Sequence, residues 1–293
     1  MLLHMGKDII NDNKILYDIK WDGWRILIHK QGERIEAYSR HGSNVTAKFP
    51  ELQEVGRSIK AETAILDCEG VVLRNGNSVF NDFAYRGQLT SEQKINLATK
   101  THPATFIAFD ILQSENESHI KEPLIQRKER LSDIIKPSNS LQVTPSIIGD
   151  GNRIFELTKD RNMEGIVGKR IDSTYQINQR SYDWLKYKHF KVTNAVILGF
   201  KENPFTMIVG ERSKNGQYRP IASVEFGFKQ EERAAFHQIC KEIKIKQEKE
   251  VTYIEPRLVC TVQYLERTEK GSLRIVSFKG FNFELTPDEC YAL

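Results

Sequence analysis

The amino-acid sequence predicts an α+β protein in two parts, a larger mixed domain over residues 1–190 and a small β-barrel over residues 191–293. Two observations carry this expectation. The first two thirds of the chain alternate apolar, strand-like runs with helix-like segments, whereas the remainder is mostly strand-like with one helical segment. Five strands and one helix in about 100 residues are typical of a barrel of the oligonucleotide/oligosaccharide-binding (OB) type.

The strands and helices of the first part are marked by local signals. A hairpin is expected to turn at residues 31–33, which include Gly32, and Asn75-Gly76 should end a long strand. Pro123 fits the first turn of a helix. Strands are expected at residues 15–20, 24–29, 34–39, 64–73, 105–112, 165–170 and 184–190, and helices at residues 123–135 and 152–162.

Near Lys191 the mixture of strand-like and helix-like segments gives way to mostly strand-like segments, so the domain boundary is expected there. Strands are predicted in the second part at residues 195–199, 206–212, 221–226, 257–266 and 273–281, with a helix at residues 230–243.

The composition describes an ordinary globular chain. Of its 293 residues, 39% are hydrophobic and 28% charged, so a core can form without disulfides or a structural metal. No apolar run approaches the ~20 residues needed to cross a bilayer, and the first residues turn polar too quickly for a signal peptide. We therefore expect a cytoplasmic monomer that does not bind membranes. The net charge of +4 is compatible with a polyanionic partner, and the four separated cysteines disfavour zinc.

The sharpest local signal is Lys-Trp-Asp-Gly-Trp-Arg at residues 20–25, a K-x-D-G-x-R pattern between two predicted strands. Taken alone, this pattern could be a charged turn. Five further motifs follow it in order: Ser-Arg-His-Gly (39–42), Leu-Asp-Cys-Glu (66–69), Ala-Phe-Asp-Ile-Leu (108–112), Glu-Gly-Ile-Val-Gly-Lys-Arg (164–170) and Trp-Leu-Lys-Tyr-Lys (184–188). No Walker A loop is present, so any use of ATP has to follow another route.

In this order the motifs resemble those of the covalent nucleotidyltransferases, which include ATP-dependent DNA ligases, RNA ligases and mRNA capping enzymes. The resemblance extends from about residue 15 to residue 281 and is greatest to the compact ligase domain of bacterial end-joining and phage-type DNA ligases. It implies a nucleotidyltransferase (adenylation) domain with antiparallel sheets and helices, followed by the OB-fold barrel.

The resemblance assigns roles to the first motifs. Lys20 would be the nucleophile that attacks ATP and carries AMP. Arg25 and Arg40 would hold the AMP and the phosphates around a nick, since arginine presents a bidentate fork to phosphate. Asp22 would orient Arg25 or a metal.

The later motifs would complete the nucleotide site. Glu69 and Glu164 would hold the ribose and a Mg²⁺ ion, with Mn²⁺ as an alternative metal. Phe109 would stack on adenine, although a core aromatic is the common alternative. Lys186 and Lys188 lie on one face of a strand, where they would bind phosphates and, as nearby cations, lower the pKa of Lys20; a solvent-facing basic strand is the alternative.

The C-terminal barrel also carries candidate residues and departures from the family pattern. Arg274 and Lys279 would help to orient pyrophosphate during self-adenylation, or they could belong to a solvated strand. Three positions depart from the usual residues: Asp18 stands where glutamate is common, Cys68 where glycine is common, and Asn282 where arginine is common.

The sequence therefore predicts an ATP-dependent DNA ligase that seals 3′-hydroxyl/5′-phosphate nicks in duplex DNA through a lysine–AMP intermediate and an adenylated DNA end. Its partners would be nicked double-stranded DNA, ATP and unidentified repair or phage proteins, in DNA repair, replication or recombination. Two alternatives stay open. One is an RNA ligase or a capping-type nucleotidyltransferase, and the other is a nick-binding protein with a weakened adenylation site.

Overall fold

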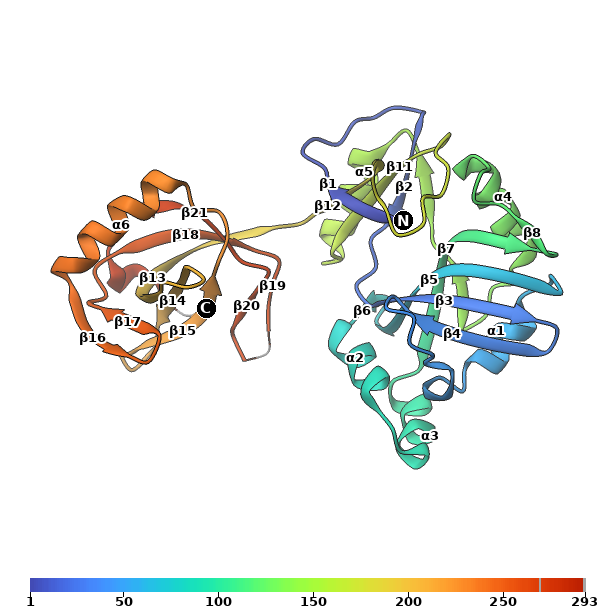
Figure 1. Cartoon of the computed structure of the whole chain (residues 1–293), viewed down its shortest axis with the longest axis horizontal. Helices are drawn as coiled ribbons and strands as arrows, with labels where there is room; N and C mark the ends of the chain where they lie inside the picture. Colours follow the sequence, from blue (N-terminus) through green and yellow to red (C-terminus); the bar gives the residue numbers. More distant parts are fainter. Residues whose placement is uncertain (269, 292–293) are drawn as a thin grey trace. The chain divides into compact units, whose positions relative to one another are not determined.

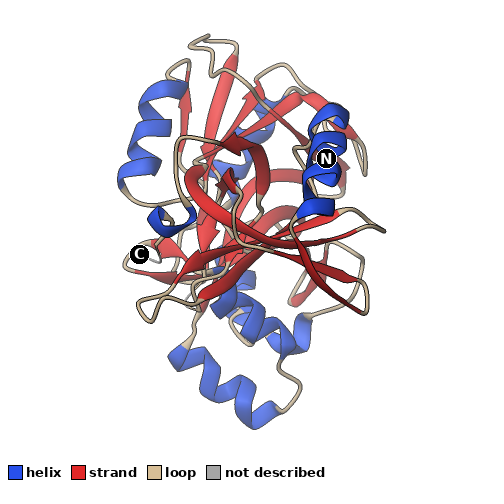
Figure 2. Ribbon diagram, turned by 90° about the vertical axis from the view of Figure 1, so that its left-hand side faces the viewer, coloured by secondary structure: helices blue, strands red, loops and turns tan. Residues whose placement is uncertain are grey.

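The computed structural model describes residues 1–268 and 270–291, and the chain divides into two compact units, Met1–Lys188 and His189–Leu293 (Figure 1). Strands predominate in both units, and the helices lie at their periphery (Figure 2). None of the described helices is long and apolar enough to span a membrane.

The first unit contains a five-stranded sheet in the order β1 (Leu2–Met5), β12 (Arg180–Lys188), β11 (Gly165–Arg170), β2 (Ile15–Ile19) and β10 (Ser146–Ile148). All neighbours are antiparallel except β1 and β12. Helix α5 (Gly151–Asp160) packs on this sheet through Ile154, which joins Tyr17, Ile166 and Tyr187 in a buried cluster.

A second sheet in the same unit has the order β4 (Arg34–Ser39), β3 (Trp24–Gln31), β5 (Thr63–Arg74), β7 (Ala104–Ser114) and β8 (Glu117–Ser118), with β6 (Asn77–Ser78) on β5 and β9 (Leu141–Val143) on β7. One face forms the main core with α1 (Leu52–Ser58). The remaining elements of this unit are η1 (Thr46–Lys48), α2 (Phe80–Gln88), α3 (Glu92–Thr101) and α4 (Leu124–Ile134).

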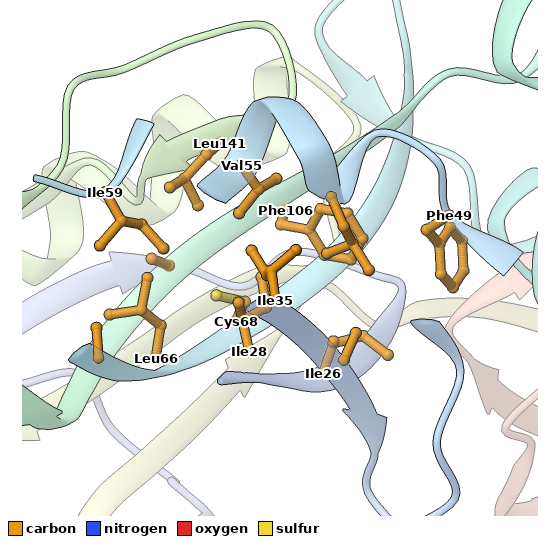
Figure 3. Packing of buried hydrophobic residues seen from close by; sticks show 14 of the residues in the cluster. Ile26, Ile28, Ile35, Phe49, Val55, Ile59, Leu66, Cys68, Phe106 and Leu141 are labelled. Carbon is orange, nitrogen blue, oxygen red and sulfur yellow. The ribbon is translucent and has the colours of Figure 1, made fainter. Parts of the chain in front are cut away.

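The alternation of side chains along β5 separates core from site. Cys68 is fully buried among Ile26, Ile28 and Leu66 in the main core (Figure 3). Its neighbours Asp67 and Glu69 therefore point to the opposite face of the sheet. The departure from glycine at position 68 is thus absorbed by core packing, where burial raises the pKa of the thiol.

Most of the predicted elements of this unit are confirmed, including the hairpin turn, where Gly32 has a positive φ of 58°. Helices α1, α2 and α3 were not predicted, because they are short and each buries only two or three residues. The predicted strands before and after Lys20 belong to different sheets, since β2 pairs with β10 and β11, and β3 pairs with β4 and β5.

The second unit is a strongly curved sheet with one covering helix. Its strands run in the order β15 (Tyr218–Val224), β14 (Thr206–Arg212), β13 (Lys191–Lys201), β17 (Val251–Ile254) and β16 (Lys244–Glu248), and β18 (Val259–Tyr264) pairs with both β13 and β21 (Ser277–Asn282). Helix α6 (Gln230–Glu242) closes the core through Phe236 and Cys240. A short 3₁₀ helix, η2 (Pro287–Glu289), follows the last strand.

Three details of this unit differ from the sequence prediction. The strand expected at residues 257–266 is divided into β18 and a short strand at Glu266–Arg267, which pair with different neighbours. The hairpin of β16 and β17 was missed, because every residue of β16 is exposed and the strand shows no apolar alternation. The strand expected at residues 273–281 is broken into β20 (Leu273–Arg274), which pairs with β19 (Glu266–Arg267), and β21. The break falls at Ile275, whose positive φ of 53° no regular strand can contain.

Candidate active site

The K-x-D-G-x-R motif crosses from one sheet of the first unit to the other. Strand β2 ends at Ile19 and β3 begins at Trp24, so Lys20 lies at the crossing, with its backbone N–H donating to the Gly165 carbonyl at 2.9 Å. A Cβ at Gly23 would lie 2.1 Å from the Gly70 carbonyl oxygen. The motif therefore needs glycine at this position because the backbones of two strands approach each other there.

Lys20 shares a carboxylate with Lys188. Its Nζ lies 2.6 Å from Glu164 Oε2, and Lys188 Nζ lies 2.5 Å from Glu164 Oε1. The Glu164 side chain is only 5% exposed. The following Gly165 has a φ of 146°, and a Cβ there would lie 2.0 Å from the Tyr187 carbonyl oxygen, which explains the Glu-Gly pair.

The charge environment of Lys20 differs from the sequence prediction. Burial lowers the pKa of Lys20, but Glu164, and then Glu69, outweigh burial and raise it above its usual value. The expected lowering by nearby cations is therefore wrong for this arrangement. The pKa that neighbouring cations lower is that of Lys186, where burial is the largest cause and the charges of Lys188 and Lys20 follow.

Glu69 faces the same site from β5. Its Oε1 accepts a hydrogen bond from the Gly23 backbone N–H at 3.1 Å. Burial raises the pKa of Glu69 to about 8, Lys20 opposes this rise, and the charge of Glu164 adds to it. A carboxyl with such a pKa exchanges its proton near neutral pH, as functional carboxyl groups often do.

Arg25 is held by three residues to which the sequence analysis gave no role. Its Nε and Nη2 bind Asp67 Oδ1 and Oδ2 at 2.9 and 2.6 Å, and Nη2 also donates to the Tyr175 hydroxyl at 2.6 Å. Its Nη1 donates to the Met1 carbonyl at 2.6 Å. The bidentate edge of this guanidinium thus engages Asp67, so a phosphate would have to approach by Nη1.

Asp22 belongs to the same motif but is anchored differently. Its backbone N–H donates to Ser78 Oγ at 3.0 Å, and its charge helps to raise the pKa of Lys20 and of Glu69. The carboxylate that orients Arg25 through two hydrogen bonds is Asp67.

A cavity of about 530 Å³ gathers the cationic candidates. Glu69, Ser39 and His41 also line it. Arg180, which the sequence analysis missed, lies on the same strand as Lys186 and Lys188, but the strand was expected to begin only at residue 184, so the alternation gave no signal for it. The cationic lining residues are Lys20, Arg25, Arg40, Arg180, Lys186 and Lys188.

A smaller cavity of about 110 Å³ shares Lys20, Arg25 and Glu69 with the larger one and is otherwise more apolar. Phe109 reaches it from a bulge in β7, where Asp67 pairs with Asp110 and Cys68 with Ala108. The rings of Phe109 and Trp184 lie edge-to-face, with centroids 6.4 Å apart. Phe109 lines this cavity and also packs, partly buried, against the cluster of Met1, Leu124, Tyr175 and Trp184, so its ring serves both the packing and the cavity wall.

A buried ion network closes the floor of the smaller cavity. Asp18, which is 2% exposed, binds Lys128 Nζ at 2.8 Å and Lys169 Nζ at 2.6 Å. The Lys169 ammonium also lies 4.1 Å from the Trp184 ring centroid. Burial raises the pKa of Asp18, but the two lysines outweigh burial and lower it. Asp18, despite being shorter than glutamate, is thus fixed as a carboxylate.

The remaining two candidates belong to the second unit. Arg274 forms an ion pair with Glu266 across the β19–β20 hairpin, and Lys279 is an exposed residue of β21. The first unit therefore brings together the other named residues, which are Lys20, Asp22, Arg25, Arg40, Glu69, Phe109, Glu164, Lys186 and Lys188.

Comparison with protein families decides the identity of this arrangement. Residues 2–188 match the family model described as ATP dependent DNA ligase domain, and residues 203–283 match the one described as ATP dependent DNA ligase C terminal region. The chain belongs to the ATP-dependent DNA ligase family. The predicted fold, a nucleotidyltransferase domain followed by an OB-type domain, and the predicted activity of an ATP-dependent DNA ligase are confirmed.

Individual relatives agree with this membership. The ligase is 31% identical over 285 residues to the SPbeta prophage-derived DNA ligase-like protein LigB of Bacillus subtilis, covering 96% of this chain and 97% of the relative. It is 31% identical over 291 residues to the bifunctional non-homologous end joining protein LigD of the same organism, covering 94% of this chain and 47% of the relative. The chain thus spans about half the length of that relative.

Solved structures give the same result. A mycobacterial DNA ligase D complexed with ATP and MES is similar over 100% of this chain and 97% of its own, with 25% identity and a TM-score of 0.58. Both matching family models are those of DNA ligases, which favours DNA over the RNA-ligase and capping alternatives.

Proposed function

We propose that this ligase seals nicks with Lys20 as its covalent nucleophile. The Lys20 Nζ attacks the α-phosphorus of ATP, a nitrogen–phosphorus bond forms, and pyrophosphate leaves. The AMP then passes to the 5′-phosphate of the nick, and the 3′-hydroxyl displaces it to form the phosphodiester. The observation that supports this proposal is the place of Lys20, which lines both a strongly cationic cavity and an adjoining apolar one.

The two cavities divide the nucleotide by chemistry. The apolar cavity suits the adenine, which would stack on Phe109. The cationic cavity suits the phosphates, where Arg40, Lys186 and Lys188 would neutralise charge, with Arg180 beside them. Phosphoryl transfer depends mainly on positioning and on neutralising charge, and this lining supplies both.

Lys20 has to lose a proton before its lone pair can attack. Because Glu164 holds it as an ammonium, Glu164 must be drawn to another positive group for the amine to become a nucleophile. Lys188 already shares Glu164 and is 9% exposed, so it is one such group.

The residues present suit a divalent cation. The charge of Glu164 reaches Glu69 and helps to raise its pKa, so the two carboxyl groups are close, and Mg²⁺ typically takes one or two protein carboxylates with waters and substrate phosphates. We propose that Glu69 and Glu164 hold Mg²⁺ or Mn²⁺, which would supply charge neutralisation at the phosphates.

The wider assignments are part of the same proposal. Residues 1–190 would form the adenylation domain and residues 191–293 the OB domain, from which Arg274 and Lys279 would help to orient pyrophosphate. The ligase would act as a cytoplasmic monomer on nicked duplex DNA. By analogy with the end-joining and prophage relatives, repair or phage-type ligation with further partner proteins would be its setting.

The test is covalent labelling with α-labelled ATP and Mg²⁺. The parent protein should acquire a label that pyrophosphate removes, whereas Lys20→Ala should not. Lys159→Ala, in an exposed ion pair, serves as the matched control and should label like the parent. Labelling of Lys20→Ala, or none in the parent even after pyrophosphate has removed any bound AMP, would overturn the proposal. Sealing of nicked DNA, compared with nicked RNA, then tests the substrate.

A further inference from the structure

Tyr175 reaches Arg25 from the loop between β11 and β12, outside every sequence motif. Its side chain is 7% exposed and its backbone N–H donates to the Ile120 carbonyl at 2.8 Å. The ring stands edge-to-face with Trp184, with centroids 6.0 Å apart, and the Arg127 guanidinium lies 5.9 Å from its centroid. Packing on two sides therefore fixes the ring.

The hydroxyl of Tyr175 closes a ring of three hydrogen-bonded side chains. It donates to Asp67 Oδ2 at 2.7 Å and accepts from Arg25 Nη2 at 2.6 Å, while Arg25 Nη2 donates to the same Asp67 oxygen at 2.6 Å. Asp67 is fully buried. Each of the three groups thus fixes the other two, in a setting where hydrogen bonds to charged groups are strong.

The three hydrogen-bonded side chains limit the N–H donors that Arg25 can offer to a substrate. A guanidinium has five N–H donors. The contacts of Arg25 with Asp67, Tyr175 and the Met1 carbonyl use four of them. Both protons of Nη2 are taken inside the protein, which directs any contact with substrate to Nη1. Without the hydroxyl, one Nη2 proton would lose its partner and Asp67 would lose one of the donors that hold it.

We propose that Tyr175 is a positioning residue that sets the orientation of Arg25 at the junction of the two cavities, both of which Arg25 lines. This inference rests on the proposed function, because it assumes that Arg25 contacts the nucleotide there. Tyr175 itself lines neither cavity, so its effect passes through Arg25 and Asp67.

The test is a double-mutant cycle between Tyr175→Phe and Arg25→Ala. Phenylalanine keeps the ring contacts and removes only the hydroxyl. Two quantities are measured in each variant: the single-turnover rate of Lys20 labelling, and the dissociation constant for α,β-methylene-ATP, which needs no turnover. Tyr17→Phe is the matched control, since it removes a hydroxyl bonded to the Ile10 carbonyl in the same unit, and it should change neither quantity.

In the protein that keeps Arg25, we expect Tyr175→Phe to lower the labelling rate about tenfold, to raise the dissociation constant of the analogue about tenfold, or to do both. In the Arg25→Ala background the same change should have less than about a twofold effect, because the group that it positions is gone. An equal loss in both backgrounds, or no loss in the parent, would overturn the inference. A parent that forms no Lys20 adduct would overturn the proposed function instead, and the analogue affinity would still test Tyr175.

Discussion

Replacing Glu164 with glutamine should both destabilise the first unit and make Lys20 more reactive. The Glu164 carboxylate lies between two ammonium groups, at 2.6 Å from Lys20 Nζ and 2.5 Å from Lys188 Nζ. Glutamine has nearly the same shape but no charge. The change would therefore leave two neighbouring cations without the anion that they share.

The structure sets the size of the loss. Removing one partner of a buried ion pair costs about 3–5 kcal/mol, because the other charge stays buried and unpaired. The side chains of Lys20 and Lys188 are 19% and 9% exposed. Water can relieve part of the cost at Lys20, so we expect a loss of about 2–4 kcal/mol. For a unit of this size that corresponds to a fall of about 5–12 °C in melting temperature.

The reactivity of Lys20 should change in the opposite direction. Burial lowers the pKa of Lys20, and Glu164 is the largest of the charges that raise it. With glutamine in its place, burial is opposed only by weaker charges, so the pKa should fall and more of the amine should be neutral at a given pH. Modification by trinitrobenzenesulfonate at pH 8, followed by mass spectrometry of the Lys20 peptide, should be faster than in the parent.

Calorimetry of the first unit's transition measures the stability. The matched control is Glu156→Gln, which removes the same charge from an ion pair with Lys159 that is 3.7 Å long and about two thirds exposed. An exposed pair contributes about 0–1 kcal/mol, so this control should melt close to the parent. The reasoning is refuted if Glu164→Gln and Glu156→Gln melt at the same temperature and trinitrobenzenesulfonate modifies Lys20 at the parent rate. The shared carboxylate would then set neither the stability of the unit nor the pKa of Lys20.

Two further predictions follow from the same site. The Glu69 carboxyl, with a pKa of about 8 against an ordinary 4.5, binds more protons in the folded than in the unfolded state between these values. Its contribution to the free energy of unfolding should therefore fall as pH rises from 5 to about 8, and urea unfolding of Glu69→Gln at several pH values should show a flatter dependence. Gly23→Ala would place a Cβ 2.1 Å from the Gly70 carbonyl oxygen, displace Lys20 and slow adenylation about 100-fold. The control Gly56→Ala, whose Cβ meets only ordinary contacts, should be adenylated at the parent rate. Equal rates for the two variants would contradict the steric argument.

Short motifs and strand periodicity, which are properties of neighbouring residues, were the features that the sequence alone determined. The order of six short motifs was enough to predict the family, and strand periodicity placed Lys186 and Lys188 on one face. The helices α1, α2 and α3 escaped prediction because their few buried residues leave little periodic signal. The β16–β17 hairpin escaped for a related reason, since β16 has no buried side at all.

In the site, the sequence determined the residue types, whereas folding determined their charges and contacts. The residue types at positions 20, 69, 164, 186 and 188 could be read from the motifs, as could the α+β class with its terminal OB-type barrel. Their charges could not, because the pKa of a lysine depends on which opposite charge folding brings within reach. The sequence separates Lys20 from Glu164 by 144 positions, and only the pairing of β11 with β2 brings them to 2.6 Å. Tertiary structure likewise turned the fork of Arg25 toward Asp67 and Tyr175, since hydrogen-bond geometry is set by contacts that no local pattern records.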